Sequence, residues 1–377
     1  MSPTKEINTI LIANRGEIAL RAIRTIKEMG KRAIAVYSTA DKDAHYLDLA
    51  DAKICIGGDK SNESYLNIPA IISAAELFNA DAIFPGYGFL SENQNFVEIC
   101  NYHNIEFIGP NSEVMALMSD KSKAKEVMKN AGVPVIPGSD GAVKSKEEAL
   151  KLAKEIGYPV ILKAAAGGGG RGMRIVQNEA NMFNAYLAAE SEAISAFGDG
   201  TIYMEKFIDK PKHIEVQILA DKYGNVLHVG ERDCSLQRRH QKLIEESPAP
   251  TLEPETRRKL LETAITATKA IKYVGAGTYE FLLDNNQNFY FMEMNTRLQV
   301  EHCVSEMVSG IDIIEQMIKV AEGYALPSQE NVKLKGHSIE CRITAEDPKT
   351  FLPSPGKIIK YVPPAGRNVR MESHCYQ

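Results

Sequence analysis

"KAAAGGGGRGMRIV", residues 163–176, places four consecutive glycines between two apolar runs. Each glycine in an ordered segment costs about 0.5–1 kcal/mol relative to alanine, so a folded chain keeps such a run only for a reason. The run "YPVILKA" before the glycines and the alternating "RGMRIV" after them are both typical of strands. The pattern therefore favours a hairpin with a glycine-rich tip over a flexible linker, which is the alternative explanation.

A glycine-rich tip lets backbone amides approach a ligand closely, and phosphate is the usual ligand of such loops. Lys163 lies on the strand that enters the tip and would place a cation beside a bound phosphate. The loop does not match the P-loop motif G-x-x-x-x-G-K-[ST], and no G-x-G-x-x-G opens a helix after a strand, so the dinucleotide fingerprint is absent. The sequence therefore predicts a polyphosphate site of another kind and argues against a nicotinamide dehydrogenase.

The composition describes a mildly acidic chain of 377 residues with 44 basic and 49 acidic residues and a net charge of −5. No basic block is present, which argues against binding to nucleic acid. The six cysteines form no C-x-x-C pair, as expected of a reduced cytoplasmic protein. We also expect no signal peptide and no membrane contact, because the apolar runs are too short.

The amino-terminal residues 1–118 alternate strand patterns with helix patterns such as residues 15–30. This alternation predicts an α/β domain with a doubly wound parallel sheet. Such sheets bind ligands beyond the carboxyl ends of their strands. The segments "NRGE" (14–17) and "PGYGFLSEN" (85–93) would lie there.

Prolines and glycines near residues 134–141 mark a boundary after a linker helix at residues 119–134. Residues 135–206 then read as a small α+β domain that contains the glycine-rich hairpin. Residues 207–377 are predicted to be mainly antiparallel. We expect two helices, at about residues 253–273 and 311–323, to cover that sheet.

Residues 277–297 predict a hairpin, with "GTYEFLLD" and "NFYFMEMNTR" on either side of "NNQ". If the turn centres between Asn286 and Gln287, Glu280 lies directly opposite Glu293. The period of two then gives one face three polar residues, Glu293, Asn295 and Arg297. Two opposed carboxylates need a cation or a proton, and oxygen ligands of this kind suit Mg²⁺ or Mn²⁺. A solvated outer face is the alternative, and a register shifted by one residue would separate the carboxylates.

Three further segments mix basic and acidic residues. The segment at residues 231–250 carries a basic group dense enough to hold anions: Arg238, Arg239, His240 and Lys242. The segment "TRLQVEH" (296–302) would continue the alternating face through Arg297, Gln299 and Glu301. In "IECRITAED", Arg342 is either a functional residue or a paired surface residue. A charged loop and a salt bridge are the alternatives for the first two segments.

Together these motifs resemble the biotin carboxylase family of ATP-grasp enzymes. The resemblance rests on "IANRGEIALR", "PGYGFLSEN", "KAAAGGGGRGMR", "ERDCSLQRRHQK", "GTYEFLLD", "MEMNTRLQVEH" and "FLPSPGKI". It runs from about residue 6 to the end and is greatest to the biotin carboxylase subunit of bacterial acetyl-CoA carboxylase. Another ATP-grasp ligase would have no need of "RRHQK" together with "RLQVEH". A non-catalytic scaffold would be expected to have lost Glu301 or the metal ligands.

The resemblance implies roles for residues along most of the chain, and it makes the glycine hairpin a lid over the triphosphate. The implied ATP-binding residues are Lys121, Lys163, Gly169, Gly170, Glu205, Lys206, Phe207, Ile208, His213, Gln237, His240, Glu280 and Glu293. The implied metal ligands are Glu280, Glu293 and Asn295, in agreement with the hairpin register. The implied bicarbonate-binding residues are Lys242, Arg297, Gln299 and Val300. The implied biotin-binding residues are Arg342 and Tyr87, and the catalytic residues are Glu301, Arg297, Lys242 and Arg342.

The resemblance also implies a mechanism in two halves. Glu301 removes a proton from bicarbonate, which attacks the γ-phosphate of MgATP and forms carboxyphosphate. Carboxyphosphate then decomposes to CO₂ and phosphate, the phosphate takes the proton from biotin N1′, and Arg342 steadies the enolate-like oxygen. Phosphoryl transfer depends on positioning and charge neutralisation, which accounts for the lysines and the Mg²⁺ or Mn²⁺ site.

The implied partners are a separate biotin carboxyl carrier protein and the carboxyltransferase subunits of acetyl-CoA carboxylase in fatty acid biosynthesis. The carrier would be separate because the chain has no A-M-K-M biotin attachment motif. Pyruvate and propionyl-CoA carboxylases contain the same kind of subunit and are the alternative. Family members dimerise through the first domain near Arg21, so a homodimer is expected. The sequence stops at "ESHCYQ", well before family members do, so we expect an incomplete carboxyl-terminal domain.

Overall fold

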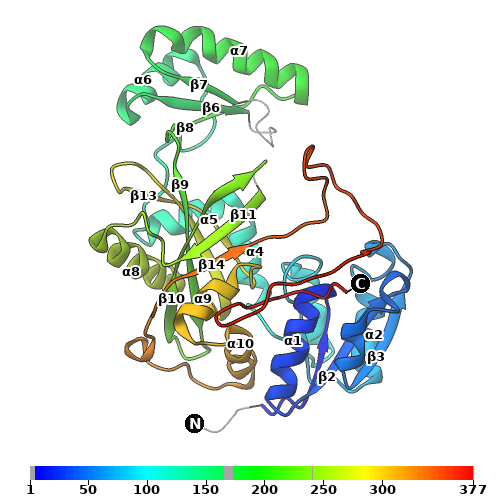
Figure 1. Cartoon of the computed structure of the whole chain (residues 1–377). Helices are drawn as coiled ribbons and strands as arrows, with labels where there is room; N and C mark the ends of the chain where they lie inside the picture. Colours follow the sequence, from blue (N-terminus) through cyan, green and yellow to red (C-terminus); the bar gives the residue numbers. More distant parts are fainter. Residues whose placement is uncertain (1–4, 165–172, 240, 377) are drawn as a thin grey trace. The chain divides into compact units, whose positions relative to one another are not determined.

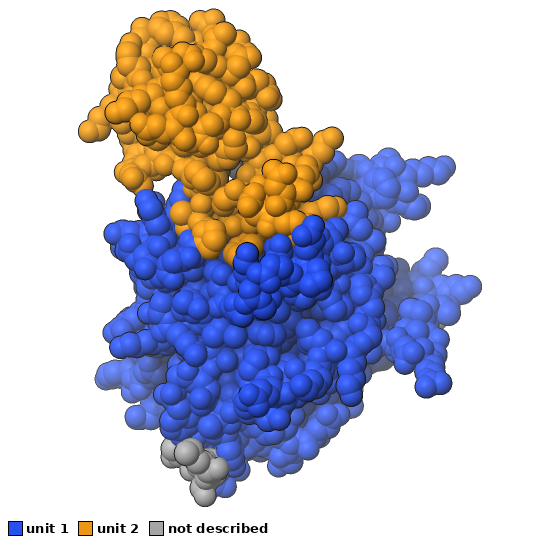
Figure 2. Space-filling view, turned by 90° about the vertical axis from the view of Figure 1, so that its left-hand side faces the viewer, with its two compact units in different colours: residues 1–133, 213–281, 293–377 blue, residues 134–212, 282–292 orange. Residues whose placement is uncertain are grey.

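The computed structural model describes residues 5–164, 173–239 and 241–376. The chain divides into two compact units, which Figure 2 shows in separate colours. The first unit contains residues 1–133, 213–281 and 293–377, and the second contains residues 134–212 and 282–292. The chain therefore passes through both units more than once.

The amino-terminal part of the first unit is built on a five-stranded parallel sheet (Figure 1). Its order is β3-β2-β1-β4-β5. The strands are β1 (Thr9–Ile12), β2 (Arg32–Ser38), β3 (Ala52–Gly57), β4 (Ala82–Phe84) and β5 (Glu106–Phe107). The strand order reverses at β1, so this sheet is doubly wound, which confirms the prediction.

Helices cover both faces of this sheet. They are α1 (Gly16–Glu28), α2 (Ile68–Leu77), α3 (Gln94–Tyr102) and α4 (Ser112–Ser119). Alternate residues of β1 point to opposite faces. Ile10 and Ile12 therefore join one apolar core with α1, whereas Leu11 joins another with α2 and α3. The helix α5 (Lys121–Asn130) follows, where the sequence predicts a linker helix.

The loops after β1 and β4 meet at the carboxyl ends of the strands, as the sequence predicts. Asn14 Nδ2 donates to the backbone oxygens of Pro85 and Tyr87 at 2.8 and 2.7 Å. The Tyr87 hydroxyl donates in turn to Glu17 in the first turn of α1. These contacts hold Tyr87 at the edge of the sheet where ligands of doubly wound folds bind.

A second sheet, of order β13-β12-β9-β10-β11-β14, belongs mostly to the first unit. Its strands are β9 (Lys212–Ala220), β10 (Val226–Arg238), β11 (Gln241–Ser247), β12 (Gly275–Leu283), β13 (Phe289–Asn295) and β14 (Ser338–Cys341). β10 runs antiparallel to β9 and β11, and β14 runs antiparallel to β11. The helices are α8 (Pro254–Ala270), α9 (His302–Ser309) and α10 (Ile313–Glu322). The predicted antiparallel character and both predicted helices are confirmed.

The second unit contains a three-stranded sheet of order β7-β6-β8. Its strands are β6 (Val160–Ala164), β7 (Met173–Val176) and β8 (Ile202–Lys206), and its helices are α6 (Lys146–Ile156) and α7 (Glu179–Phe197). β6 and β7 pair antiparallel from Val160↔Val176 to Lys163↔Met173. The predicted hairpin is therefore confirmed, although its glycine-rich tip lies outside the described residues.

Two details differ from the sequence prediction. β13 ends at Asn295, and residues 296–301 turn into α9 instead of continuing as an alternating strand. The turn before β13 is closed by Asp284 and Asn288, whose N and O atoms lie 2.9 Å apart, so its centre is Asn286. Gln287 adopts a left-handed φ of 64° in this turn. The predicted direct opposition of Glu280 and Glu293 required a turn centred between Asn286 and Gln287, so the observed turn does not support it.

All six cysteines are described, and each of them is a free thiol. Their buried fraction varies: Cys100 and Cys234 are buried, whereas Cys55, Cys341 and Cys375 are exposed. Among the described residues, no helix has the length and apolar character needed to cross a membrane.

Candidate active site

Lys242 on β11 is the centre of a buried cluster of charged side chains in the first unit. Its Nζ lies 3.0 Å from Glu280 Oε1 and 2.7 Å from Glu301 Oε1, and it also donates to Glu215. Burial works to lower the pKa of Lys242, but these carboxylates raise it above its usual range. Lys242 therefore stays a cation and holds three carboxylates around one point.

Arg232 on β10 lies beneath this cluster and is fully buried. Its Nη2 lies 3.0 Å from Glu215 Oε2 and 2.8 Å from Gln299 Oε1. It also donates to Gln217, Thr278 and Ser305. Burial opposes the charge of Arg232, but Glu215 and Glu301 raise its pKa above the usual range. The guanidinium therefore ties several strands to the start of α9 and fixes the floor of the site.

Sequence reasoning did not identify Arg232 or Glu215 as site residues. The signal that could have found Glu215 is the period of two in "HIEVQ", which puts His213, Glu215 and Gln217 on one face of β9. Arg232 occurs within "ERD", which is typical of exposed loops. Only the partners that surround it explain its burial.

His213 on β9 joins the cluster from the side of Glu280. Its Nε2 lies 3.1 Å from Glu215 Oε1 and 3.0 Å from Glu280 Oε2. Burial works to lower the pKa of His213, yet the two carboxylates raise it to about 9. Burial raises the pKa of Glu280, but His213 and Lys242 outweigh this effect and lower it to about 2. At neutral pH His213 is therefore a cation and Glu280 an anion.

The predicted metal ligands come from the neighbouring strands β12 and β13. Asn295 Nδ2 donates to Glu280 Oε1 at 2.8 Å. Glu293 precedes Asn295 by two residues, and its carboxylate lies 3.6 Å from Lys121 Nζ. Two carboxylates and an amide provide oxygen donors only, so the set fits Mg²⁺. His213, Glu215 and Glu280 also have ligand atoms within 4.8 Å of one another.

Gln299 and Arg297 connect the charged cluster to the metal ligands. Gln299 Nε2 donates to Glu280 Oε1 at 2.9 Å, on the opposite side from its contact with Arg232. Arg297 Nη2 donates to Asn295 Oδ1 at 3.0 Å, and its Nε donates to Glu92 at 2.8 Å. Glu92 belongs to the "PGYGFLSEN" segment, which the sequence predicts to be a ligand-binding loop. The sequence did not predict its contact with Arg297.

Arg342 follows β14 and approaches Glu301 from the side opposite Lys242. Its Nη2 lies 2.8 Å from Glu301 Oε2, while its Nε donates to Glu245 Oε1 at 2.6 Å. Burial opposes the charge of Arg342, and Glu301 and Glu245 raise its pKa. Glu301 is 2% exposed. Its two carboxylate oxygens therefore contact two different cations, Lys242 and Arg342.

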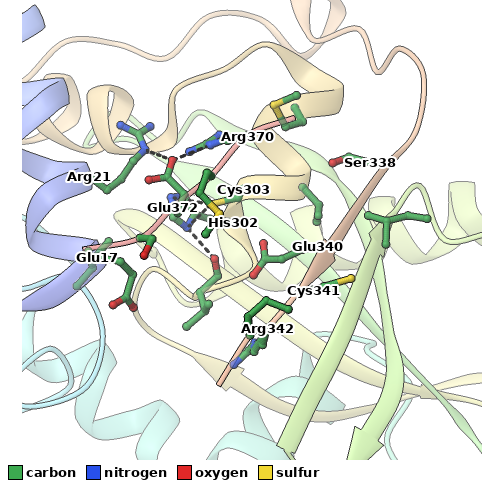
Figure 3. Close-up of a pocket in the computed structure, with 18 of the residues that line it drawn as sticks. Glu17, Arg21, His302, Cys303, Ser338, Glu340, Cys341, Arg342, Arg370 and Glu372 are labelled. Carbon is green, nitrogen blue, oxygen red and sulfur yellow. Dashed lines mark hydrogen bonds and ion pairs between the residues drawn. The ribbon is translucent and has the colours of Figure 1, made fainter. Parts of the chain in front are cut away.

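A cavity of about 470 Å³ opens beside Arg342 (Figure 3). It lies between β14, the start of α9, α1 and the segment near residues 368–375. Tyr87, Val300, Glu340 and Arg342 all line it. The structure therefore brings both predicted biotin-binding residues to one cavity next to Glu301.

The predicted ATP-binding residues of the second unit have contacts within that unit. Lys163 on β6 donates to Glu205 on β8. Lys206 Nζ instead donates to the backbone oxygens of residues 157 and 158 at 2.8 and 3.0 Å. Phe207 and Ile208 follow the end of β8, and the Phe207 amide donates to the Pro159 oxygen at 3.1 Å.

The remaining predicted residues are Gln237, Lys121 and three that the structure does not describe. Gln237 lies opposite Lys242 in the register of β10 and β11, and its Nε2 donates to the Cys234 oxygen at 2.9 Å. The Lys121 side chain is 85% exposed, so its ammonium is free to meet a ligand besides Glu293. Gly169, Gly170 and His240 lie outside the described residues.

The arrangement combines three kinds of group: the Glu301 carboxylate, the cations beside it and oxygen donors for a metal. A cavity adjoins them. Low local polarity strengthens each electrostatic contact relative to water. A carboxylate within hydrogen-bond reach of a bound acid can take a proton from it. Such a set suits proton removal followed by phosphoryl transfer, and the cavity has room for an organic acceptor.

Three family models match the chain in succession. The biotin carboxylase N-terminal domain matches residues 6–115, the ATP-binding domain of the carbamoyl-phosphate synthase L chain matches residues 120–329, and the biotin carboxylase C-terminal domain matches residues 340–377. The matches cover nearly the whole chain in the same order as the elements described above.

Similar proteins agree with these matches. Biotin carboxylase of Nostoc sp. is 57% identical over 373 residues, which cover 98% of this chain and 83% of the relative. A crystal structure of a biotin carboxylase–βγ-ATP complex from Campylobacter jejuni is 78% identical, with a TM-score of 0.88, and covers 99% of this chain and 83% of that one. The biotin carboxylase domain dimer of Hydrogenobacter thermophilus 2-oxoglutarate carboxylase, in complex with MgADP, ADP and bicarbonate, is 51% identical. Its TM-score is 0.82, and it covers 96% of this chain and 80% of that one.

Proposed function

The chain belongs to the biotin carboxylase family, and we propose that the charged cluster around Glu301 divides the family reaction between two sides of one carboxylate. The chain is an ATP-grasp ligase that carboxylates biotin with ATP, Mg²⁺ and bicarbonate. One observation supports this proposal most directly. Glu301 Oε1 lies 2.7 Å from Lys242 Nζ, and Glu301 Oε2 lies 2.8 Å from Arg342 Nη2. The Lys242 side serves bicarbonate, and the Arg342 side serves biotin.

In the first half of the reaction, Glu301 takes the proton of bicarbonate. The bicarbonate oxygen attacks the γ-phosphorus of ATP, the bond to the leaving ADP oxygen breaks, and carboxyphosphate forms. Lys242 and Arg297 hold the bicarbonate by charge, and Gln299 and Val300 complete its pocket. The contacts that support this assignment are those of Lys242 with Glu301 and of Gln299 with Glu280.

Glu280, Glu293 and Asn295 are the proposed ligands of Mg²⁺ or Mn²⁺. When bound, the metal neutralises charge on the phosphates of ATP. The oxygen-only donor set and the contact between Glu280 and Asn295 support this assignment. Lys242, His213 and Arg297 orient these ligands through their side-chain contacts.

In the second half, carboxyphosphate breaks down to CO₂ and phosphate. The phosphate takes the proton from biotin N1′, and N1′ then forms a bond to the carbon of CO₂. Arg342 stabilises the negative charge that develops on the ureido oxygen, and Tyr87 lines the same cavity. The common cavity beside Glu301 supports the placement of biotin there.

We propose ATP-binding roles for residues in each unit, considered separately. In the first unit the proposed residues are Lys121, His213, Gln237, His240, Glu280 and Glu293. In the second unit they are Lys163, Gly169, Gly170, Glu205, Lys206, Phe207 and Ile208. The βγ-ATP complex of the Campylobacter jejuni relative supports a nucleotide site in this family.

The chain acts as a biotin carboxylase subunit and therefore requires a biotin carrier as partner. We propose that this carrier is a separate biotin carboxyl carrier protein of a cytoplasmic acetyl-CoA carboxylase, with carboxyltransferase subunits, in fatty acid biosynthesis. We also propose a homodimer that forms near Arg21; the dimer of the Hydrogenobacter thermophilus domain supports the dimeric state. Arg21 itself is buried, and its contacts with Glu306 at 3.1 Å and Asp312 at 2.8 Å hold α1 against α9 and the start of α10.

Substitution of Glu301 tests the function directly. Glu301→Gln keeps the shape of the side chain but removes the base. Bicarbonate-dependent ATP cleavage should therefore fall by about 10²–10⁴-fold. The measurement is phosphate release with and without bicarbonate at saturating MgATP. Glu330→Gln is the control, because Glu330 is exposed on a separate turn. Full bicarbonate-dependent activity in Glu301→Gln would exclude Glu301 as the base.

A further inference from the structure

Two carboxyl side chains face each other across β11 and β14 beside the proposed biotin cavity. Glu245 on β11 is paired directly with Glu340 on β14. Directly opposed residues have Cβ atoms about 4.5–5.5 Å apart, so their side chains share one face of the sheet. Two negative charges at this separation are unfavourable, which makes a shared proton or a cation necessary.

Each of these side chains has one buried oxygen without a hydrogen-bond partner among the described residues. Glu245 is fully buried; its Oε1 accepts from Arg342, but its Oε2 has no partner. Glu340 Oε2 is likewise buried and unpartnered. A buried acceptor without a donor is costly, and a proton held by this pair would remove that cost.

Arg342 and Arg232, the cations that act on this pair, already form ion pairs with other carboxylates. Arg342 is divided between Glu245 and Glu301, and Arg232 is bound to Glu215 and its neighbours. The titratable and charged groups that act on Glu340 or respond to it come from several elements: Glu245, Glu301, Arg342, Arg232, Tyr87 and Cys303. Three carboxylates therefore surround the single guanidinium of Arg342.

The pKa shifts of Glu340 and Glu245 agree with an excess of carboxylates around Arg342. Burial, Glu245 and Glu301 together raise the pKa of Glu340 to about 8, against the opposing effects of Arg342 and Arg232. Burial also raises the pKa of Glu245, against the effect of Arg342. Of the two, Glu245 keeps the direct contact with Arg342, so the proton belongs mainly to Glu340.

We propose that Glu340 is a positioning residue for the biotin half-reaction: it carries a proton at neutral pH and leaves Arg342 directed at Glu301 and at the cavity. Glu340 lines that cavity, and its carboxyl group points away from β14 into it (Figure 3). Ionised Glu340 would be a third anion beside Arg342 and would draw the guanidinium away from Glu301. This inference rests on the proposed role of Arg342 toward biotin.

A stability titration tests the proton without any assay of activity. The folded pKa of Glu340, about 8, lies above its ordinary value of 4.5, so the folded chain binds this proton more tightly than the unfolded chain. Stability from this group is therefore complete below pH 4.5 and is lost as the pH rises to about 8. Glu340→Gln cannot ionise.

The Tm of Glu340→Gln, measured relative to the unsubstituted chain, should therefore rise between pH 5 and pH 8 and level off above that. The control Glu330→Gln should show a constant Tm difference over the same range. A constant difference in Glu340→Gln as well would overturn the proposal, because the folded and unfolded chains would then hold the proton equally.

The second test separates positioning from structure through a pH profile. The ratio of biotin carboxylation to ATP cleavage should fall roughly tenfold between pH 7 and pH 9, as Glu340 with a pKa of about 8 ionises. In Glu340→Gln the ratio should stay flat, because the amide imitates the protonated acid. Equal profiles in both proteins would contradict the proposal. Absence of carboxylation at every pH would instead reject the proposed function, and the Tm titration would still decide the position of the proton.

Discussion

Arg232 shows how a single side chain supports several catalytic groups at once. Its guanidinium contacts Glu215 and Gln299, and these contact Lys242 and Glu280 in turn. Because Arg232 is fully buried, its guanidinium has no contact with solvent, and these protein groups must satisfy its hydrogen bonds. The positions of the proposed substrate-binding residues therefore depend on a residue that is proposed to touch no substrate.

Arg232→Met should destabilise the first unit strongly. The substitution leaves the fully buried Glu215 facing Lys242 and His213 alone, and breaking one side of a buried ion pair costs about 3–5 kcal/mol. The measurement is the free energy of unfolding in urea. Arg258→Met is the matched control, because Arg258 makes its ion pairs on the exposed surface of α8 and should change stability little. Equal effects of the two substitutions would show that the Arg232 network contributes no more than a surface pair.

The sequence allowed only part of the site to be predicted at this scale. Glu301, Lys242 and Arg342 were predicted from the family resemblance, and the structure brings them together. Glu245 and Glu340 were not predicted, because a carboxylate on a strand has the same pattern whether it faces water or another carboxylate. Their pairing depends on the register of β11 and β14, which are separated by about ninety residues of chain.

At the scale of elements, the end of β3 requires a glycine. Gly57 has a φ of 149°, and a Cβ atom at this position would lie 1.9 Å from the backbone oxygen of Glu63. Backbone atoms cannot move aside as a flexible side chain can. The turn from β3 to the short helix at Ser61–Glu63 therefore depends on the absence of a side chain.

Gly57→Ala should lower the free energy of unfolding by about 1–3 kcal/mol, because the chain must shift to relieve this contact. Thermal unfolding followed by circular dichroism measures the effect. Gly356→Ala is the control: no atom lies within 4 Å of its Cβ position, and its φ is not positive. A Gly57→Ala chain as stable as the control would mean that the turn adapts without strain.

Elements with strong periodicity were predictable, and those set by distant contacts were not. The parallel sheet and the β6–β7 hairpin follow from apolar runs and glycines. The end of β13 at Asn295 was not predictable, because "TRLQVEH" keeps the alternation of a strand. Its backbone turns there since Thr296 and Arg297 bind Glu92, which lies about two hundred residues away in the chain.

At the scale of the whole molecule, one carboxylate connects two cations from distant parts of the chain. Glu301 lies between Lys242, on the side of the metal ligands, and Arg342, on the side of the cavity. The sequence predicted this function only through the combination of motifs. Each motif alone could also be explained without a function, as a charged loop or a surface salt bridge. Lys242 on β11, Glu301 just before α9 and Arg342 just after β14 meet at this point, so the fold brings together motifs that are distant in the sequence.

The most direct test of this division is Arg342→Gln, with two rates measured on the same sample. ATP cleavage is followed by phosphate release, and biotin carboxylation by fixation of labelled bicarbonate into free biotin. Because Arg342 is proposed to act only after carboxyphosphate has formed, carboxylation should fall by about 10²-fold or more while bicarbonate-dependent ATP cleavage continues. A fall of both rates by the same factor would contradict the account, since Arg342 would then serve the bicarbonate half as well.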